Sequence, residues 1–370
     1  MNKPHPYSNW LEIDRSIIAN NLRALQRIAQ TSLMAVLKAN AYGHGLEEIG
    51  RVAAEAGVAY LGVARTEEGV ILRSHGIETP ILVLGYTDPL FYSQARDSNI
   101  TLTIFHPDQL IALSALCADG PPQRVHVKVD TGMSRLGLPP EAAFDLLKQA
   151  GRLHGVQVEG IFTHYARADE PQAETTQVQE RQFLDLLTRL EDAGLRPPLA
   201  HASNSAATLC WPNSRLDIVR PGIALYGMRP SEKVVLPQEI QPALTWKARL
   251  SAIKQLKRGA GISYGHTYHT QSHERIGVVP VGYGDGFRRV GGNWMLLRGK
   301  RVPVVGRVCM DQCMIQLDHV PDAQVGDEIV VLGSQGDVRV QAEDIAARWG
   351  TIPYEVVTGL ASRIPRIYIN

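Results

Sequence analysis

Long apolar runs, paired cysteines and an excess of charge of either sign are all missing from this sequence. No run of 18 apolar residues occurs, so no membrane-spanning helix is expected. Lysine and arginine number 38 against 37 aspartate and glutamate residues, and this balance argues against a nucleic acid as the main partner. The first 16 residues lack the apolar core of a signal peptide. We therefore expect a cytoplasmic protein.

The four cysteines are Cys117, Cys210, Cys309 and Cys313, and they form no C-x-x-C pair. Apolar neighbours surround most of them, which is typical of buried thiols in a reducing compartment. Cys309 and Cys313 could be metal ligands, but no second pair of ligands follows them. We interpret them as two residues on one face of a strand and expect no metal site.

Between about residues 12 and 228 the chain alternates short β-rich runs with segments of helical periodicity. Apolar residues recur at three- and four-residue spacing in 47–57, 142–153 and 179–194, which predicts helices. Strand, helix and strand repeated eight times predict parallel βαβ units that fit a closed (β/α)8 barrel. A doubly wound open sheet is the alternative. The predicted strands are 33–38, 60–64, 81–85, 101–105, 125–130, 158–164, 199–203 and 216–219.

The pattern of apolar and polar residues changes after a charged, proline-containing stretch at 229–242. Residues 243–256 alternate apolar and polar side chains in strand fashion, short apolar runs between glycine-rich turns follow, and only 342–350 has a helical pattern. This predicts a mostly antiparallel β domain. The expected fold is α/β, with a (β/α)8 TIM-type barrel over residues 1–235 and a C-terminal β domain over residues 236–370.

Polar side chains gather at the ends of the predicted barrel strands. In such barrels the functional groups lie at the C-terminal ends of the strands. Any one of these residues alone could be an ordinary surface or structural group, but five polar strand ends on one rim predict a site. They are Lys38, Lys128 with Asp130, His164, His201–Ser205 and Arg220.

Lys38 has the setting of a lysine that forms a Schiff base. Burial and neighbouring cations, here Arg135 and Arg220, lower the pKa of a lysine and favour the neutral amine that attacks a carbonyl. The residues after strands seven and eight, "NSA" and "PGI", supply a hydroxyl and free N–H groups where such barrels bind phosphate. A reactive lysine, a phosphate site and a cation opposite a ring nitrogen together describe pyridoxal phosphate.

Seven segments resemble, in order, the signature segments of the alanine racemases, which are pyridoxal-phosphate enzymes of the barrel type. The segments are "AVLKANAYGHG", "VKVDTGMSRLG", "HASNSAATL", "RPGIALYG", "GISYGHTY", "VGYGDGF" and "GRVCMDQ". The resemblance implies interconversion of L-alanine and D-alanine, with D-alanine supplied for peptidoglycan. It implies two bases: Lys38, which carries the cofactor as an internal aldimine, and Tyr264. It also implies a homodimer in which the partner subunit supplies Tyr264.

The resemblance assigns further roles to the matching positions. Arg220 would face the pyridine nitrogen, and His201 would steady Arg220. Arg135 and the Met310 backbone would hold the substrate carboxylate. Lys128 matches a lysine that is carbamylated in many members of the family. Tyr283 and Asp311 would form the entrance and the substrate pocket. The implied cofactor contacts are Lys38, Tyr42, His164, Asn204, Ser205, Arg220, Gly222, Ile223 and Tyr354.

Alternatives with the same cofactor stay open. An amino-acid decarboxylase on a similar barrel usually has a glutamate at the ring nitrogen, so Arg220 argues against it, as does the order of Lys38 and Tyr264. A non-catalytic pyridoxal-phosphate carrier would end after the barrel, whereas this chain continues for about 130 residues. Within the racemase class, the sequence does not fix the tolerance for serine or other amino acids, or a biosynthetic rather than a catabolic role.

Overall fold

The computed structural model describes residues 6–118, 120–170 and 173–370, which fold into two compact units. The barrel unit comprises Ile17–Gln241, and the β unit comprises Met1–Ser16 together with Pro242–Asn370. This division differs in two places from the boundary expected between residues 235 and 236. Residues up to Gln241 belong to the barrel unit, and the described residues 6–16 belong to the β unit.

The barrel unit contains eight parallel strands among its described residues: β2 (Ser32–Val36), β3 (Tyr60–Val63), β4 (Ile81–Val83), β5 (Leu102–Ile104), β6 (Gln123–Lys128), β7 (Val156–Phe162), β8 (Leu199–His201) and β9 (Ile218–Val219). They pair in the orders β4-β3-β2-β9 and β5-β6-β7-β8. Thr101 connects β4 to β5, since its backbone N donates to Ile81 at 2.8 Å and its carbonyl accepts from Val83 at 3.0 Å. Asp217 N donates to Ala200 O at 3.1 Å and connects β8 to β9. The eight strands therefore form the closed barrel that was predicted.

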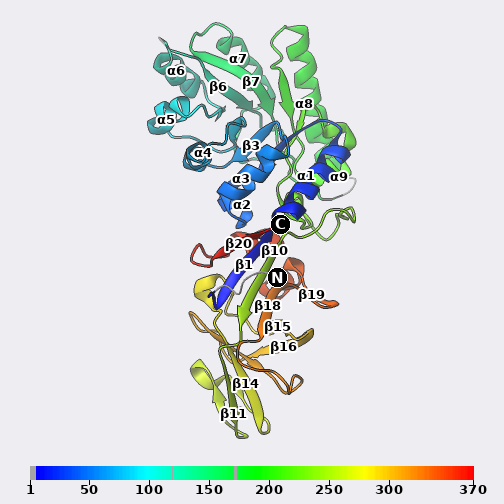
Figure 1. The fold of residues 1–370 in the computed structure, drawn as a ribbon. Helices are drawn as coiled ribbons and strands as arrows, with labels where there is room; N and C mark the ends of the chain where they lie inside the picture. The colour runs from blue at the N-terminus through cyan, green and yellow to red at the C-terminus, as the bar shows by residue number, and fades with distance from the viewer. Residues whose placement is uncertain (1–5, 119, 171–172) are drawn as a thin grey trace. The chain divides into compact units, whose positions relative to one another are not determined.

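Amphipathic helices follow most of the barrel strands and flank them (Figure 1). In α8, Phe183, Leu186, Leu187 and Leu190 are buried at helical spacing. The helices predicted over 47–57, 142–153 and 179–194 are confirmed by α3, α7 and α8. Apart from the short turn labelled α2 (Lys38–Tyr42), the α-helices of the described part of this region are α1 (Arg15–Ala29), α3 (Leu46–Glu55), α4 (Thr66–Ser74), α5 (Tyr92–Asp97), α6 (Pro107–Leu116), α7 (Pro140–Ala150), α8 (Glu174–Asp192) and α9 (Ser205–Cys210).

The β unit is mostly antiparallel, as predicted. Its main sheet has the order β11-β14-β17-β16-β15-β18-β10-β1-β20, and β19 pairs with β18. A separate two-stranded hairpin is formed by β12 and β13. The strands are β1 (Asn9–Asp14), β10 (Leu244–Arg249), β11 (Ala252–Leu256), β12 (Gly261–Ile262), β13 (Tyr268–His269), β14 (Glu274–Val279), β15 (Trp294–Leu297), β16 (Lys300–Val305), β17 (Cys313–Gln316), β18 (Glu328–Gln335), β19 (Val338–Val340) and β20 (Arg366–Ile369).

Three details of the β unit differ from the sequence-based expectations. β1 pairs with β10 in antiparallel fashion and with β20 in parallel (Figure 1), although a barrel was expected from residue 1. Besides α10 (Ala342–Trp349), which was predicted, a second helix α11 (Pro353–Thr358) forms after its proline. The interpretation of Cys309 and Cys313 as residues of one strand is wrong, because only Cys313 lies in β17 and Cys309 lies in the connection before it.

Candidate active site

Lys38 lies just after β2, where the chain makes a left-handed turn. β2 ends at Val36, two residues earlier than predicted, and the non-glycine residues 39–42 all have φ between 51° and 55°. L-amino acids avoid this conformation because Cβ approaches the next carbonyl oxygen, at a cost of roughly 1–2 kcal/mol per residue. The turn, labelled α2 (Lys38–Tyr42), therefore depends on contacts from its surroundings.

Two polar side chains hold this turn from either end. Glu68 Oε1 accepts a hydrogen bond from Ala39 N at 2.7 Å, directly after Lys38. Asn40 Oδ1 accepts from Leu46 N at 2.8 Å, at the start of α3. Sequence reasoning gave no role to Asn40 and missed Glu68, because a left-handed turn of non-glycine residues has no periodic pattern. Both residues fix the backbone from which the Lys38 side chain extends.

An aromatic stack at the end of the same turn brings Tyr42 to Gly222. The rings of Tyr42 and Tyr226 stack with 4.9 Å between centroids, and the His44 ring lies 4.5 Å from Tyr226. A Cβ atom added to Gly222 would lie 2.3 Å from Tyr42 Oη, so this position needs a glycine. The Tyr42 hydroxyl and the Gly222 backbone are therefore direct neighbours.

Ser205 lies on the same side of the barrel as Gly222. Its Oγ accepts hydrogen bonds from Gly222 N at 2.8 Å and from Ala224 N at 3.3 Å. Asn204 caps α9, with its Oδ1 accepting from Ala207 N at 3.0 Å. Two hydroxyls and a cluster of backbone N–H groups at the ends of β8 and β9 form a cradle of the kind that binds phosphate in such barrels. The structure thus brings together Tyr42, Asn204, Ser205, Gly222 and Ile223.

Cationic side chains converge on His164 beside this cradle. Burial holds the pKa of His164 well below its ordinary value, and four neighbouring cations lower it further: Arg220, Lys128, Arg135 and Lys38. No hydrogen bond or ion pair engages the Lys38 amine or the Arg135 guanidinium within the described residues. The two arginines alone make this a positive site, which favours an anionic ligand.

Both lysines of this cluster have environments that favour the neutral amine. Burial lowers the pKa of Lys38, Arg135 and Arg220 lower it further, and Glu68 acts in the opposite direction. Burial holds the pKa of Lys128 well below its ordinary value, and the Lys128 Nζ lies 4.5 Å from the centroid of the Phe162 ring. A neutral amine is a nucleophile and a base, whereas an ammonium group is neither.

Arg220 is buried and held by three acceptors. Its NH1 group contacts His201 Nδ1 at 2.7 Å, and its NH2 group donates to the carbonyl oxygens of Thr163 and Ala202 at 2.9 Å each. Burial lowers the pKa of Arg220 to about 9, which is still above neutrality. The guanidinium therefore stays charged and fixed in direction.

The β unit holds the remaining predicted site residues. Tyr264 lies in the turn between β12 and β13, and its side chain is 67% exposed. The preceding residue, Ser263, donates to Arg307 O at 2.6 Å, so the turn is attached to the segment that leads to Met310. Tyr283 N donates to Cys309 O at 3.0 Å in the same region. Tyr264, Tyr283 and Met310 are thus exposed side chains on neighbouring loops.

Arg363 connects two of these loops and was missed in the sequence. Its Nε donates to Asp285 Oδ1 and its NH2 to Asp311 Oδ1, each at 2.8 Å. Asp285 lies two residues after Tyr283, and its Oδ2 accepts from Gly282 N at 2.9 Å. Nothing in the sequence pattern links an arginine so close to the C-terminus to these turns. The last predicted residue, Tyr354, lies in α11 of the β unit.

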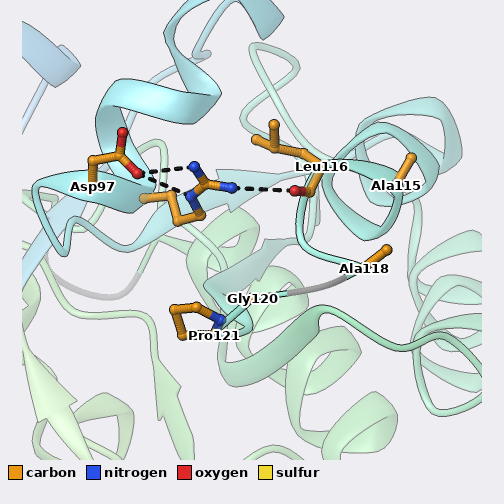
Figure 2. Close-up of a pocket in the computed structure, with 7 residues that line it drawn as sticks. Asp97, Ala115, Leu116, Ala118, Gly120 and Pro121 are labelled. Atoms are coloured by element: carbon orange, nitrogen blue, oxygen red, sulfur yellow. Dashed lines mark hydrogen bonds and ion pairs between the residues drawn. The ribbon is translucent and has the colours of Figure 1, made fainter.

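A surface pocket elsewhere on the barrel unit offers less chemistry (Figure 2). Arg96 donates to the Asp97 carboxylate at 3.0 Å and to Leu116 O at 3.2 Å, so its charge is already compensated. The other lining residues are small or apolar. No group of three or more histidine, cysteine or acidic side chains is placed to bind a metal within the described parts of the chain. The described helices include none that is both long and apolar enough to cross a membrane.

A closed parallel barrel with a buried lysine of lowered pKa and polar groups gathered at its strand ends is typical of small-molecule enzymes of the TIM-barrel class. Comparison with known families makes this specific. Residues 13–230 match the model described as "Alanine racemase, N-terminal domain", and residues 243–368 match "Alanine racemase, C-terminal domain". The chain belongs to the alanine racemase family, whose members are pyridoxal-phosphate-dependent racemases.

Individual relatives match over nearly their whole length. The chain is 42% identical to the alanine racemase of Desulfovibrio desulfuricans over 98% of each chain. An alanine racemase structure from Clostridium difficile 630 superposes with a TM-score of 0.94 at 38% identity, covering 99% of this chain and 97% of that one. The alanine racemase of Bacillus anthracis, solved with bound L-Ala-P, gives a TM-score of 0.94 at 37% identity, covering 100% and 96%.

Proposed function

We propose that the protein interconverts L-alanine and D-alanine by a two-base mechanism, with pyridoxal phosphate held at the barrel strand ends. The observation that carries this proposal is the cluster of two arginines and two lysines around His164, in which the Lys38 amine has a lowered pKa. Membership of the alanine racemase family and the likeness to a relative solved with bound L-Ala-P support alanine as the substrate.

The residues of the barrel unit fit the cofactor. The phosphate, a dianion, would bind Tyr42, Asn204, Ser205 and the backbone N–H groups of Gly222 and Ile223, with Tyr354 completing the set. Gly222 supports this assignment, since a side chain there would overlap the Tyr42 hydroxyl. Lys38 would attach the cofactor covalently, and His164 would lie beside its ring. When bound, pyridoxal phosphate supplies the electron sink for the bond broken at the substrate Cα.

Arg220 would face the ring nitrogen of the cofactor. A guanidinium that is held by His201 and two carbonyl groups presents donor groups only, and its pKa of about 9 keeps its own proton in place at neutral pH. The ring nitrogen would therefore stay unprotonated. This weakens the electron sink and favours return of a proton to Cα over side reactions such as transamination.

Racemisation needs a proton removed from one face of Cα and returned to the opposite face. One side chain does not easily reach both faces, so two bases are required. Lys38 is suited to one of them because burial and two arginines favour its neutral form. Tyr264 would be the other base. Arg135 and the Met310 backbone would orient the substrate carboxylate, and Tyr283 and Asp311 would line the entrance.

Lys128 is proposed to carry a carbamate. Burial and the charges of Arg220 and Arg135 lower the pKa of its amine, and a neutral amine is the form that reacts with carbon dioxide. The carbamate anion would partly compensate the charges of Arg220 and Arg135 and hydrogen-bond to Arg135. We also propose a homodimer in which each subunit supplies Tyr264 to the other, a cytoplasmic location, and D-alanine supply for peptidoglycan.

The cofactor and the reaction can be tested together. The protein is purified with pyridoxal phosphate, its visible absorption is recorded, and the optical rotation of L-alanine is followed over time. Lys38→Ala should abolish covalent attachment and racemisation. The control is Lys148→Ala, which changes an exposed lysine of α7 and should leave both unchanged. Full activity of Lys38→Ala would refute the proposal.

The shared site has its own test, which uses two inactive variants. Lys38→Ala and Tyr264→Phe are mixed, dissociated and allowed to reassociate. If each site takes Lys38 from one subunit and Tyr264 from the other, half of a random mixture is mixed dimers with one intact site. About a quarter of the wild-type activity should then return. A site built within a single subunit would give no recovery.

A further inference from the structure

Three buried side chains, Arg220, His201 and His126, form a hydrogen-bonded row in the barrel unit. Arg220 NH1 lies 2.7 Å from His201 Nδ1, and His201 Nε2 lies 2.8 Å from His126 Nδ1. His201 is the last residue of β8, and His126 lies in β6. All three side chains are at most 4% exposed. His126 was not among the predicted site residues.

The number of protons that each neutral ring carries determines which nitrogen in this row donates and which accepts. A guanidinium only donates, so His201 Nδ1 must be the acceptor. Neutral His201 then carries its single proton on Nε2, which donates to His126 Nδ1. Neutral His126 in turn carries its proton on Nε2. In the opposite arrangement, His126 would donate to His201, and His201 would have to accept at both nitrogens and carry no proton at all.

Two close contacts constrain the position of the His126 ring. A Cβ atom on Gly160 of β7 would lie 2.4 Å from His126 Nδ1, so the imidazole packs directly against the glycine backbone. The Tyr60 ring meets the His126 ring edge-on, with 5.6 Å between centroids. The His126 Nε2 atom is buried and has no hydrogen-bond acceptor among the described residues. The His126 ring is therefore closely packed, although one of its polar atoms has no hydrogen-bond partner in the described part of the chain.

We propose that His126 is a positioning residue for Arg220, which it serves by accepting the Nε2 proton of His201. This interaction holds His201 in the one tautomer that offers a lone pair to the guanidinium. Without an acceptor at position 126, the His201 proton can move to Nδ1, where it would oppose the Arg220 N–H group. The consequence for the cofactor rests on the proposed function, in which Arg220 faces the ring nitrogen.

The environment keeps the row in this state at neutral pH. Burial, followed by the charges of Arg220 and Arg124, lowers the pKa of His126 to about 3. Burial also holds the pKa of His201 well below its ordinary value, with Arg220, His126 and Lys128 acting in the same direction. Neither ring takes up a second proton at neutral pH, so the His201 lone pair stays available to Arg220.

The tautomers can be measured directly by ¹⁵N NMR of the whole protein labelled at its histidine ring nitrogens. The measurement is made on protein stripped of cofactor, so it does not depend on the proposed reaction. We expect both His126 and His201 to be protonated at Nε2 only, from pH 6 to pH 9. A cationic ring, or a proton on His201 Nδ1, would overturn the proposal. Failure of the unmodified protein to bind pyridoxal phosphate or racemise alanine would instead count against the proposed function alone.

Three variants separate positioning from packing. His126→Leu fills the space but removes the acceptor, and it should shift the His201 proton and weaken cofactor binding about tenfold, as expected for one lost hydrogen bond. His126→Asn keeps an acceptor oxygen near the Nδ1 position and should restore the His201 signal and most of the affinity. Tyr60→Phe, the control, keeps the ring against His126 and should change neither. Equal effects of Leu and Asn, or an unchanged His201 signal in the Leu variant, would refute the positioning role, and the Asn variant decides the matter if the Leu variant does not fold.

Discussion

The predicted site residues of the barrel unit and those of the β unit are held in contrasting ways. Arg220, His201 and Ser205 are almost completely buried, and their polar atoms hydrogen-bond to residues in or just after neighbouring strands. Tyr264 is 67% exposed and Met310 54% exposed. Folding of the barrel alone sets the positions of buried, hydrogen-bonded groups. The position of an exposed side chain depends instead on the groups that pack against it. We therefore expect that substitutions at the β-unit site residues change activity without changing stability, and that substitutions at the barrel-unit site residues change both.

Tyr264→Phe should give the largest effect and the clearest separation. Loss of the proposed second base should lower kcat about a thousandfold in both directions. The melting temperature should stay the same, because an exposed hydroxyl contributes little to folding. Polarimetry and a thermal melt measure the two quantities. In the control, Tyr268→Phe removes a hydroxyl that donates to Glu274 at 2.7 Å in the same hairpin, and it should cost about 1 kcal/mol of stability with kcat unchanged. A kcat within twofold of wild type for Tyr264→Phe would break the comparison.

Gly222→Ala in the barrel unit should lower both cofactor affinity and stability. The new Cβ would lie 2.3 Å from Tyr42 Oη, so the stacked Tyr42 ring has to move. We expect cofactor affinity to fall about a hundredfold and the free energy of unfolding to fall by about 2 kcal/mol, as in overpacked cores. Gly291→Ala is the matched control, since no atom lies within 4 Å of its added Cβ. Unchanged affinity in the Gly222 variant would show that Tyr42 is not part of the phosphate cradle.

Asn40→Ala should have an intermediate effect on the left-handed turn that carries Lys38. It removes the acceptor for Leu46 N and places a poorer residue at φ 54°. We expect a loss of about 2 kcal/mol in stability and about tenfold in cofactor affinity. Asn40→Gly removes the same acceptor but adopts positive φ freely, so it should lose less. If Gly were worse than Ala, backbone conformation would not be what the asparagine supports.

Arg363→Gln should have the smallest effect, on the loops of the β unit. Its ion pairs with Asp285 and Asp311 are partly exposed, and solvent screens such pairs, so they contribute little to stability. We expect KM for alanine to rise about threefold with kcat nearly unchanged, measured from initial rates. Arg298→Gln is the control, because Arg298 also binds two aspartates in this unit, Asp322 and Asp327, away from the site loops. An equal change in KM for both variants would mean that Arg363 has no special role.

Most of the barrel can be predicted from the sequence. The residues that hold the site residues in position cannot. Apolar periodicity and strand-end polarity place Lys38, His164, His201 and Arg220 on one rim, and the structure brings them together. The periodicity of apolar residues cannot locate the left-handed turn. The turn depends on one hydrogen bond between the Asn40 side chain and the Leu46 backbone N–H, and such a bond leaves no repeating pattern in the sequence. Supporting residues such as Glu68, His126 and Arg363 act from other elements, and only three-dimensional contact makes them visible.

The β unit shows a second limit of reading a chain locally. Trp10, Leu11 and Ile13 have the burial of a strand, but alternation does not identify the sheet that a strand joins. The same limit explains Cys309 and Cys313. Their four-residue spacing suits several local structures, and the connection that ends before β17 was not apparent from residue types. The pattern of side chains predicted well where helices and strands lie, and it predicted poorly which strands pair with one another.

The pairing of β1 with β10 and β20 has a consequence for synthesis on the ribosome. β1 emerges first, yet its antiparallel partner lies beyond the whole of Ile17–Gln241, and Asn370 contacts Asp14 across 356 positions of sequence. At ordinary elongation rates, β1 waits on the order of tens of seconds for its neighbours. The barrel can complete its ring during that interval, while an apolar strand segment stays available to chaperones or to other nascent chains.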